Sequence, residues 1–235
     1  MALILIGTGV AFDLTLAGLE ALKSCSEAYI ETYTNPATKE QITALERLCG
    51  RKIALLERSQ VEGPLLVDKA KSSDVCILAS GDPLTATTHI TLVIEAKEKG
   101  IPVVVIHNSS IHSVAPARAG LQMYRFGKTA SLVNPRPNYK PTSSLDIIRE
   151  NLSRNCHTLA LLDTEPEPME AKAALEMLAE FGRVVVLSRM GYPDEKVTYG
   201  SIEELKNKNL GSPPCTVIVP AKLHPMEQEF LELLK

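Results

Sequence analysis

The residues best suited to chemistry in this chain of 235 residues are Gly81-Asp82-Pro83, which follow the apolar run Val75–Ala79 after Ser80. Glycine lets a ligand approach the backbone closely, and a carboxylate can bind an ammonium group or stabilise a neighbouring positive charge. Gly7 and Gly9 follow a second apolar run and offer another close approach. Gly-Asp-Pro alone is also typical of a simple turn, so its place in the fold must decide its role.

The segment that positions Asp82 has the pattern of strand, loop, helix and strand. Residues 75–79 and 101–106 are apolar runs typical of strands buried on both faces. A helix is predicted from about 86 to 99, because Leu92, Val93 and Ala96 have helical spacing. Such a unit has parallel strands and a right-handed crossover. Both strands therefore end at one edge of the sheet, where open α/β sheets bind ligands.

Strands and helices alternate along the whole first half of the chain. Strands are predicted at residues 2–6, 28–32 and 52–56, and helices at 38–48 and 65–71. A further helix follows the first glycine loop, with Asp13 or Thr15 as its N-cap. This alternation predicts an N-terminal α/β domain, residues 1–110, built on a doubly wound parallel sheet.

The pattern changes after His107. Helices are predicted at 143–154, 169–181 and 202–207, and strands at 158–162, 183–187, 196–199 and 215–219. Close spacing near the end indicates a mixed sheet, so residues 111–235 are predicted to form a C-terminal α/β domain. The boundary falls near 108–113, and a ligand crevice is expected between the domains. The proline-rich segment 134–141 is predicted to be a surface loop.

Composition excludes several classes of function. Hydrophobic residues are 45% and charged residues 23%, which is ordinary for a globular protein, and the net charge of −3 gives no general field that attracts nucleic acid or membranes. No transmembrane run or signal peptide is apparent, so a cytoplasmic location is expected. The five cysteines are scattered and read as reduced thiols, and no metal-ligand spacing is present.

One local cluster of positive charge stands out against this background. It consists of Arg118, Arg125, Lys128, Arg136 and Lys140. Scattered solvated charge is the ordinary interpretation, and a docking surface for a protein substrate or its bound RNA is the alternative.

The first glycine loop also admits a dinucleotide site. Gly7 and Gly9 fit the start of the GxGxxG pattern, and Glu31 lies near the place of a ribose-binding acid. Phe12 stands where the third glycine belongs, so the match is partial and a close backbone turn is the simpler interpretation.

Several longer segments resemble a known family. They are GDPLTATTH from Gly81, IPVVVIHNSSIHS from Ile101, GLQMYRFGK from Gly120, CHTLALLD from Cys156 and VPAKLH from Val219. Together, and in this order, they resemble the diphthine synthase branch of the class III, tetrapyrrole-methylase-like methyltransferases that use S-adenosylmethionine (SAM). GDP alone would indicate only the superfamily, whereas the combined set is much more specific.

The resemblance implies a two-domain α/β homodimer with SAM bound between its domains. It also implies transfer of methyl groups to the amino group of a 3-carboxy-3-aminopropyl histidine in translation elongation factor 2. From the net charge and composition, no direct nucleic acid or membrane partner is expected. By position, the SAM contacts would be Val10, Asp82, Thr85, Ser110, Ile111, Leu162, Met190 and Cys215. Cys215 stands where this family commonly has histidine, and the first loop is about two residues shorter than usual.

The chemistry expected of such a site needs few special groups. Displacement at a methyl carbon requires mainly positioning and an unprotonated acceptor amine, so no metal and no protein nucleophile are expected. Asp163 and Glu165 are candidates to take the proton. A methylase of porphyrinoids or ribosomal RNA, a SAM-binding regulator without catalysis and a Rossmann dehydrogenase are the alternatives. The number of methyl groups transferred, three or four, stays open.

Overall fold

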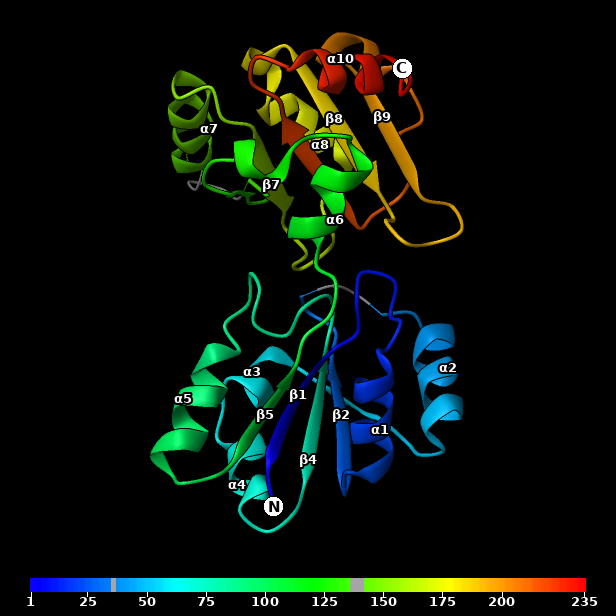
Figure 1. The fold of residues 1–235 in the computed structure, drawn as a ribbon, viewed down its shortest axis with the longest axis vertical. Helices are drawn as coiled ribbons and strands as arrows, with labels where there is room; N and C mark the ends of the chain where they lie inside the picture. The colour runs from blue at the N-terminus through cyan, green and yellow to red at the C-terminus, as the bar shows by residue number, and fades with distance from the viewer. Residues whose placement is uncertain (35–36, 136–141) are drawn as a thin grey trace. The chain divides into compact units, whose positions relative to one another are not determined.

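The computed structural model describes residues 1–34, 37–135 and 142–235. The chain forms two compact units, Met1–Ile111 and His112–Lys235. Both units are α/β, the first with a parallel sheet and the second with a mixed sheet, and this confirms the predicted fold class (Figure 1). Among the helices that the structure describes, none has the length and apolar character needed to cross a membrane.

A five-stranded parallel sheet forms the centre of the N-terminal unit. Its strands are β1 (Leu3–Gly7), β2 (Glu27–Glu31), β3 (Ala54–Leu56), β4 (Val75–Ala79) and β5 (Val103–Ile106). They lie in the order β3-β2-β4-β1-β5, so β1 and β4, which carry the two glycine loops, are neighbours. Their carboxyl ends meet at one edge, as the sequence predicts. The prediction that residues 101–106 form a strand buried on both faces is wrong, because β5 is the edge strand of the sheet and Val104 is 45% exposed.

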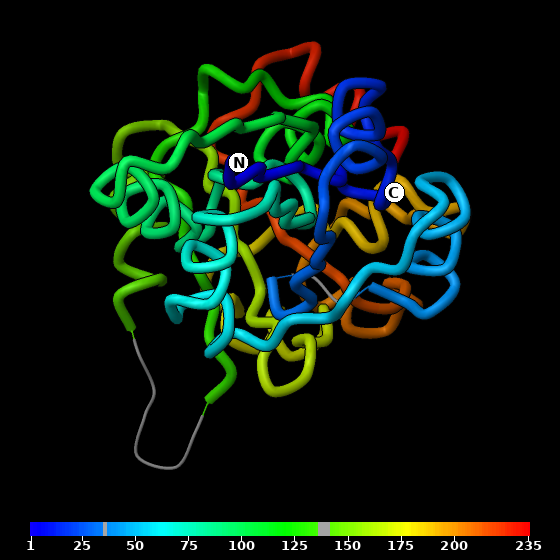
Figure 2. The backbone as a smooth tube through the Cα atoms, turned by 90° about the horizontal axis from the view of Figure 1, so that it is seen from below, coloured from blue at the N-terminus to red at the C-terminus, as the bar shows by residue number. Residues whose placement is uncertain are grey.

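Helices cover both faces of this sheet. They are α1 (Leu16–Ser24), α2 (Lys39–Cys49), α3 (Arg58–Val61), α4 (Leu65–Ala70) and α5 (Ile90–Glu98). Figure 1 shows α1 and α2 on one side of the strands and α3, α4 and α5 on the other, and the path of the chain can be followed as a tube in Figure 2. A core cluster that includes Leu5, Leu66 and Leu92 joins β1 to α4 and α5.

Local signals set the ends of α1 and α2 as predicted. Thr15 is the N-cap of α1 and accepts a hydrogen bond from the amide of Gly18 at 3.0 Å. Thr38 forms a capping box with Gln41 at the start of α2. Gly50 ends α2 with a φ of 71°, a conformation that glycine adopts without steric cost.

The start of α5 differs from the prediction. The helix begins at Ile90 rather than near residue 86. Ala86 has a φ of 57°, which lies in the left-handed region and is incompatible with a right-handed helix. The segment between Asp82 and His89 is therefore a loop, of which Asp82 and Thr85 belong to the candidate site described below.

The C-terminal unit contains a mixed sheet in the order β6-β7-β10-β8-β9. The strands are β6 (Ala130–Leu132), β7 (Thr158–Leu162), β8 (Arg183–Ser188), β9 (Lys196–Ser201) and β10 (Cys215–Val219). The α-helices are α6 (Ile111–Arg118), α7 (Ser143–Ser153), α8 (Ala171–Met177), α9 (Ile202–Lys206) and α10 (Pro225–Glu232), and the 3-10 helices are η1 (Met123–Arg125) and η2 (Ala179–Phe181). Strand β10 runs antiparallel to both of its neighbours, β7 and β8.

Several short elements were not anticipated from the sequence. They are α3, η1, β6 and α10. The strand β6 has three residues and α3 has four, too few for an apolar period to appear. For the longer α10, the start is marked by His224 before Pro225, a cap that sequence reasoning overlooked.

Candidate functional site

Three loops converge at the carboxyl ends of β1, β4 and β5. Gly9 and Gly81 exchange backbone hydrogen bonds of 3.1 and 2.9 Å, which joins the first two loops. The side-chain amide of Asn108 donates to the carbonyl oxygens of Gly7 and Asp13 at 3.1 and 2.8 Å, which joins the third. The three loops are thus held as one surface by backbone and amide groups.

The glycines in these loops are required by close packing. A Cβ on Gly7 would lie 2.6 Å from the carbonyl oxygen of Gly81, closer than real Cβ contacts allow. At Gly81 the backbone conformation is the reason instead, because its φ of 70° is strained for other residues, whereas a Cβ there would make only ordinary contacts. The glycines therefore let the three loops pack directly against one another at the carboxyl edge of the sheet.

Asp82 is the charged centre of this surface. One carboxylate oxygen accepts hydrogen bonds from the amide of Leu84 and the hydroxyl of Thr85, both at 3.0 Å. The other oxygen lies 2.6 Å from Nδ1 of His107. Burial alone would raise the pKa of Asp82, but the hydrogen bonds from Leu84, His107 and Thr85 outweigh it and hold the pKa below its usual value. The side chain is therefore an anion at neutral pH.

The N-terminal unit brings together five of the predicted SAM contacts. Val10 follows Gly9, and Asp82 and Thr85 share the second loop. Ser110 lies against Gly81, and Ile111 begins α6 directly after it. These residues belong to the three loops that converge at the carboxyl edge.

The other three predicted contacts gather at one end of the C-terminal sheet. Leu162 ends β7, Met190 follows the end of β8, and Cys215 begins β10. Because β10 is antiparallel to both neighbours, its first residue lies beside their last ones, and Cys215 pairs with Ser188 in the register. Each unit thus carries one predicted half of the site; that the halves face each other across a crevice stays a prediction.

Cys215 is a neutral, hydrogen-bonded thiol. Its Sγ lies 3.2 Å from the hydroxyl oxygen of Ser188, whose other hydrogen bond goes to the carbonyl of Leu210. Burial raises the pKa of the thiol above its usual value. At this position Cys215 therefore offers a small apolar surface rather than a charge or a nucleophile.

The two candidate proton acceptors follow Leu162. The carboxylate of Asp163 accepts hydrogen bonds from the amides of Asn134 and Glu165 at 3.1 and 3.3 Å. Its backbone carbonyl accepts the amide of Met169 at 2.8 Å. Asp163 therefore shapes the loop after β7, and its carboxylate lies next to the predicted cofactor contact.

The described members of the basic cluster all form ion pairs. Arg118 pairs with Glu195, Arg125 with Glu227, and Lys128 with Glu150 at 3.6 Å. Arg136 and Lys140 lie outside the described residues, as does most of the predicted proline-rich loop. The three described members are thus not a free patch of positive charge.

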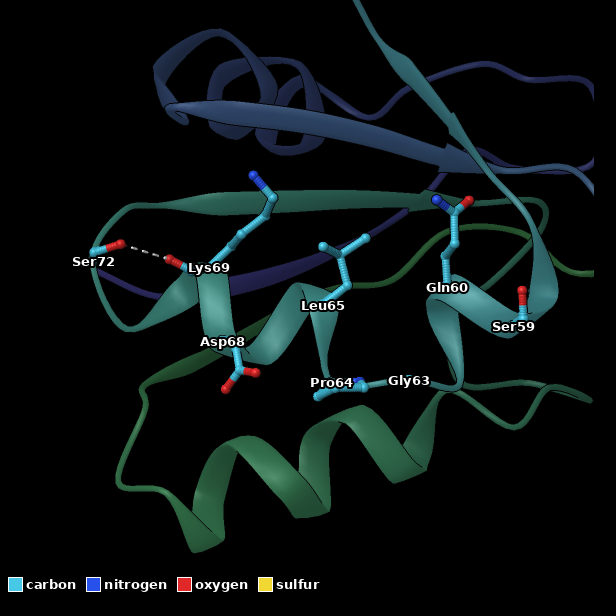
Figure 3. A pocket seen from close by; sticks show the side chains of 8 residues that line it. All are labelled: Ser59, Gln60, Gly63, Pro64, Leu65, Asp68, Lys69 and Ser72. Carbon is cyan, nitrogen blue, oxygen red and sulfur yellow. Dashed lines mark hydrogen bonds between the residues drawn. The ribbon is translucent and has the colours of Figure 1, made fainter.

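Two surface pockets of the N-terminal unit contain none of the predicted site residues. The larger has a volume of about 570 Å³ and is lined by residues of α3, α4 and their connections, including Asp68 and Lys69 (Figure 3). The second, of about 440 Å³, is lined by residues around the starts of β2 and β3. Among the described residues, no group of three or more His, Cys, Asp or Glu side chains is arranged to hold a metal ion.

Glu31 does not offer its carboxylate to a ribose, as a dinucleotide site would require. The side chain is fully buried, and one oxygen accepts the amide of Thr34 at 2.9 Å. The other oxygen has no hydrogen-bond partner within the described residues. Burial raises the pKa of Glu31 above the ordinary value of 4.5.

Replacing Glu31 with glutamine is expected to stabilise the protein at neutral pH, by on the order of 1 kcal/mol. With a raised pKa, folded Glu31 keeps its proton at pH values where the unfolded chain has lost it. The free energy of unfolding therefore falls as the pH rises from about 4.5 through the folded pKa, and Glu31→Gln should flatten this decline. Urea unfolding from pH 5 to 8 measures it, with exposed Glu98→Gln as the control. Equal slopes for wild type and Glu31→Gln would contradict the assignment.

Comparisons with known proteins place these features in a family. A family model described as tetrapyrrole (corrin/porphyrin) methylases matches residues 2–206. A diphthine synthase of Methanocaldococcus jannaschii is 40% identical over 99% of this chain and 98% of its own length, and one of Methanococcus maripaludis is 38% identical over 94% and 93%. A crystal structure of a diphthine synthase, 33% identical, superposes with a TM-score of 0.92 over 100% of this chain and 96% of that one. The chain therefore belongs to the tetrapyrrole methylase family and, within it, to the diphthine synthases.

Proposed function

We propose that this protein is a SAM-dependent methyltransferase that methylates the amino group of the 3-carboxy-3-aminopropyl histidine of translation elongation factor 2. The product is diphthine, and the reaction is a step of diphthamide biosynthesis. The observation that carries this proposal is the match to diphthine synthases over nearly the full length of both chains. It includes the region after residue 206, which the general methylase model does not reach.

The residues present fit the proposed cofactor. Gly7, Gly9 and Gly81 let the three loops pack closely, which brings the predicted contacts Asp82 and Ser110 to the same edge of the sheet. The ionised Asp82 suits a ligand that carries an ammonium group and a positively charged sulfur. Leu162, Met190 and Cys215 would supply the second, less polar half of the site.

SAM supplies a methyl group on a positively charged sulfur, whose departure as a neutral thioether drives the transfer. The protein has to hold the acceptor amine in line with that group and keep it unprotonated. Removal of the acceptor amine from water on binding would favour its neutral form, because desolvation disfavours the ammonium form. Asp163 and Glu165, next to Leu162, are proposed to receive the proton directly or through water.

The remaining expectations extend this proposal. The protein is proposed to act as a homodimer, in the cytoplasm where the elongation factor works, and to contact that factor without binding nucleic acid or a membrane. The ion pairs of Arg118, Arg125 and Lys128 support the absence of a nucleic-acid surface at this cluster.

Transfer of a labelled methyl group tests the proposed function. The protein is incubated with methyl-labelled SAM and elongation factor 2 that carries the aminocarboxypropyl histidine. We expect label in the elongation factor, and none in a control factor whose histidine is unmodified. SAM binding without any transfer to the modified factor would contradict the proposal and would point to a regulator or to another acceptor.

A further inference from the structure

His89 is buried beside the loop that carries Asp82, although it lies outside the predicted contacts. Its side chain is 1% exposed at the N-cap position of α5. Nδ1 lies 3.0 Å from the carbonyl oxygen of Pro83, and Nε2 lies 3.1 Å from the hydroxyl of Tyr33. Both ring nitrogens are therefore engaged, one with the loop and one with the segment after β2.

The partners of His89 fix its tautomer. A carbonyl oxygen can only accept, so Nδ1 carries a proton and donates it to Pro83. In the neutral ring Nε2 is then an acceptor, and the hydroxyl of Tyr33 donates to it. The two rings also meet edge to face, with centroids 6.3 Å apart, and the guanidinium of Arg58 lies 4.9 Å from the centre of the Tyr33 ring. The imidazole is thus held in one orientation.

The loop from Asp82 to His89 depends on side chains for its shape. Ala86 has a positive φ, a conformation that costs a residue other than glycine on the order of 1 kcal/mol. Asp82 holds the amide of Leu84, and the hydroxyl of Thr87 accepts the amide of His89 at 2.9 Å. Loss of the donor at Nδ1 would leave the buried carbonyl of Pro83, directly after Asp82, without this partner.

We propose that His89 is a positioning residue for the proposed SAM site, and that it acts by holding Pro83 and hence the carboxylate of Asp82. Tyr33 completes the arrangement by fixing the ring of His89. The inference rests on the proposed function, because it concerns how the chain holds that cofactor. It assigns His89 no contact with the reacting atoms.

Two amide substitutions separate the roles of the two ring nitrogens. His89→Asn places an amide donor near the position of Nδ1 and retains the bond to Pro83, whereas His89→Gln reaches the position of Nε2 and loses that bond. Leaving a buried acceptor unpaired costs enough to weaken SAM binding by roughly tenfold in His89→Gln. We expect His89→Asn to bind within about threefold of wild type. Calorimetry of SAM binding to the full chain measures both.

Two further variants complete the design. Tyr33→Phe removes only the hydroxyl and should weaken binding about threefold. Thr88→Ala, next to His89 but exposed, should leave binding unchanged. At saturating SAM, the kcat of every variant should stay within about twofold of wild type, since a positioning residue for the cofactor alters KM for SAM rather than the chemical step.

The outcomes distinguish this inference from the proposed function. If wild type binds SAM, and both His89→Gln and Tyr33→Phe bind it with the affinity of wild type, the role of His89 is overturned. The proposed methyltransferase function is not affected by that result. If His89→Gln does not fold, the SAM affinities of Tyr33→Phe and Thr88→Ala are compared instead. Equal SAM affinities of these two variants overturn the inference. Failure of wild type to bind SAM would overturn the proposed function, and this inference with it.

Discussion

Replacing Asp82 with alanine is expected to weaken SAM binding by roughly 10- to 100-fold, because hydrogen bonds to a charged group contribute about 1.5–3 kcal/mol. The substitution removes the anion from the converging loops. It also frees the amide of Leu84 and the hydroxyl of Thr85, which now share one oxygen of Asp82. Equilibrium binding of SAM to the purified protein is the measurement.

Asp82→Asn separates the shape of the loop from its charge. The asparagine oxygen can still accept from Leu84 and Thr85, while the group that faces His107 becomes a neutral amide. If the charge is what the cofactor requires, Asp82→Asn should bind SAM nearly as weakly as Asp82→Ala. Asp68→Ala, an exposed carboxylate lining the pocket in Figure 3, is the matched control and should bind normally. If Asp82→Ala binds SAM with the affinity of wild type, Asp82 is not part of the SAM site.

Replacing Glu227 with alanine is expected to destabilise the protein by about 3–5 kcal/mol, the usual cost of breaking a buried ion pair from one side. Glu227 is 1% exposed and accepts the amides of His224 and Gln122 at 2.8 and 3.1 Å. It also pairs with Arg125 and lies 3.3 Å from Nε2 of His157. Its removal leaves several donors without their acceptor at once. Urea unfolding measures the loss.

The pH dependence of protein stability tests the role of Glu227 in a second, independent way. Burial would raise its pKa, but the amides of His224 and Gln122 and the charges of His157 and Arg125 hold it below 4.5. A depressed folded pKa contributes stability above the unfolded value, and this is lost as the pH falls through the folded pKa. Glu227→Gln should therefore flatten the loss of stability in acid. Glu229→Gln, a control at an exposed position on the same helix, should change neither the free energy of unfolding nor its pH dependence. Equal free energies of unfolding for Glu227→Ala and wild type would contradict the role given to Glu227.

Much of the N-terminal sheet could be predicted because its signals are local. The runs 75–79 and 101–106 are apolar and bounded by polar residues, and Thr15, Thr38 and Gly50 mark helix ends by their own chemistry. The start of α5 could not be predicted in this way. The apolar period continues back through Ala86, and only its left-handed backbone, set by contacts around the loop, ends the helix earlier.

Contacts between residues that are far apart in the sequence could not be predicted from sequence patterns. Arg125 and Glu227 are 102 positions apart, and no spacing rule relates them. The hydrogen bond between His107 and Asp82 likewise depends on the loops after β4 and β5 lying close together in the fold. Leu162, Met190 and Cys215 were named through the family resemblance alone. Their placement at one sheet end follows from β10 lying antiparallel between β7 and β8, which is a tertiary fact.

Peptide mass spectrometry of elongation factor 2 tests the central claim most directly. The factor carrying the aminocarboxypropyl histidine is incubated with SAM and wild-type protein, or with Asp82→Ala as the matched control, and the histidine peptide is fragmented. Methyl masses on the amino group of that side chain with wild type, and fewer with Asp82→Ala, are the predicted result, and their number decides between three methylations and four. An unchanged peptide after incubation with a wild-type protein that binds SAM would contradict the proposed function.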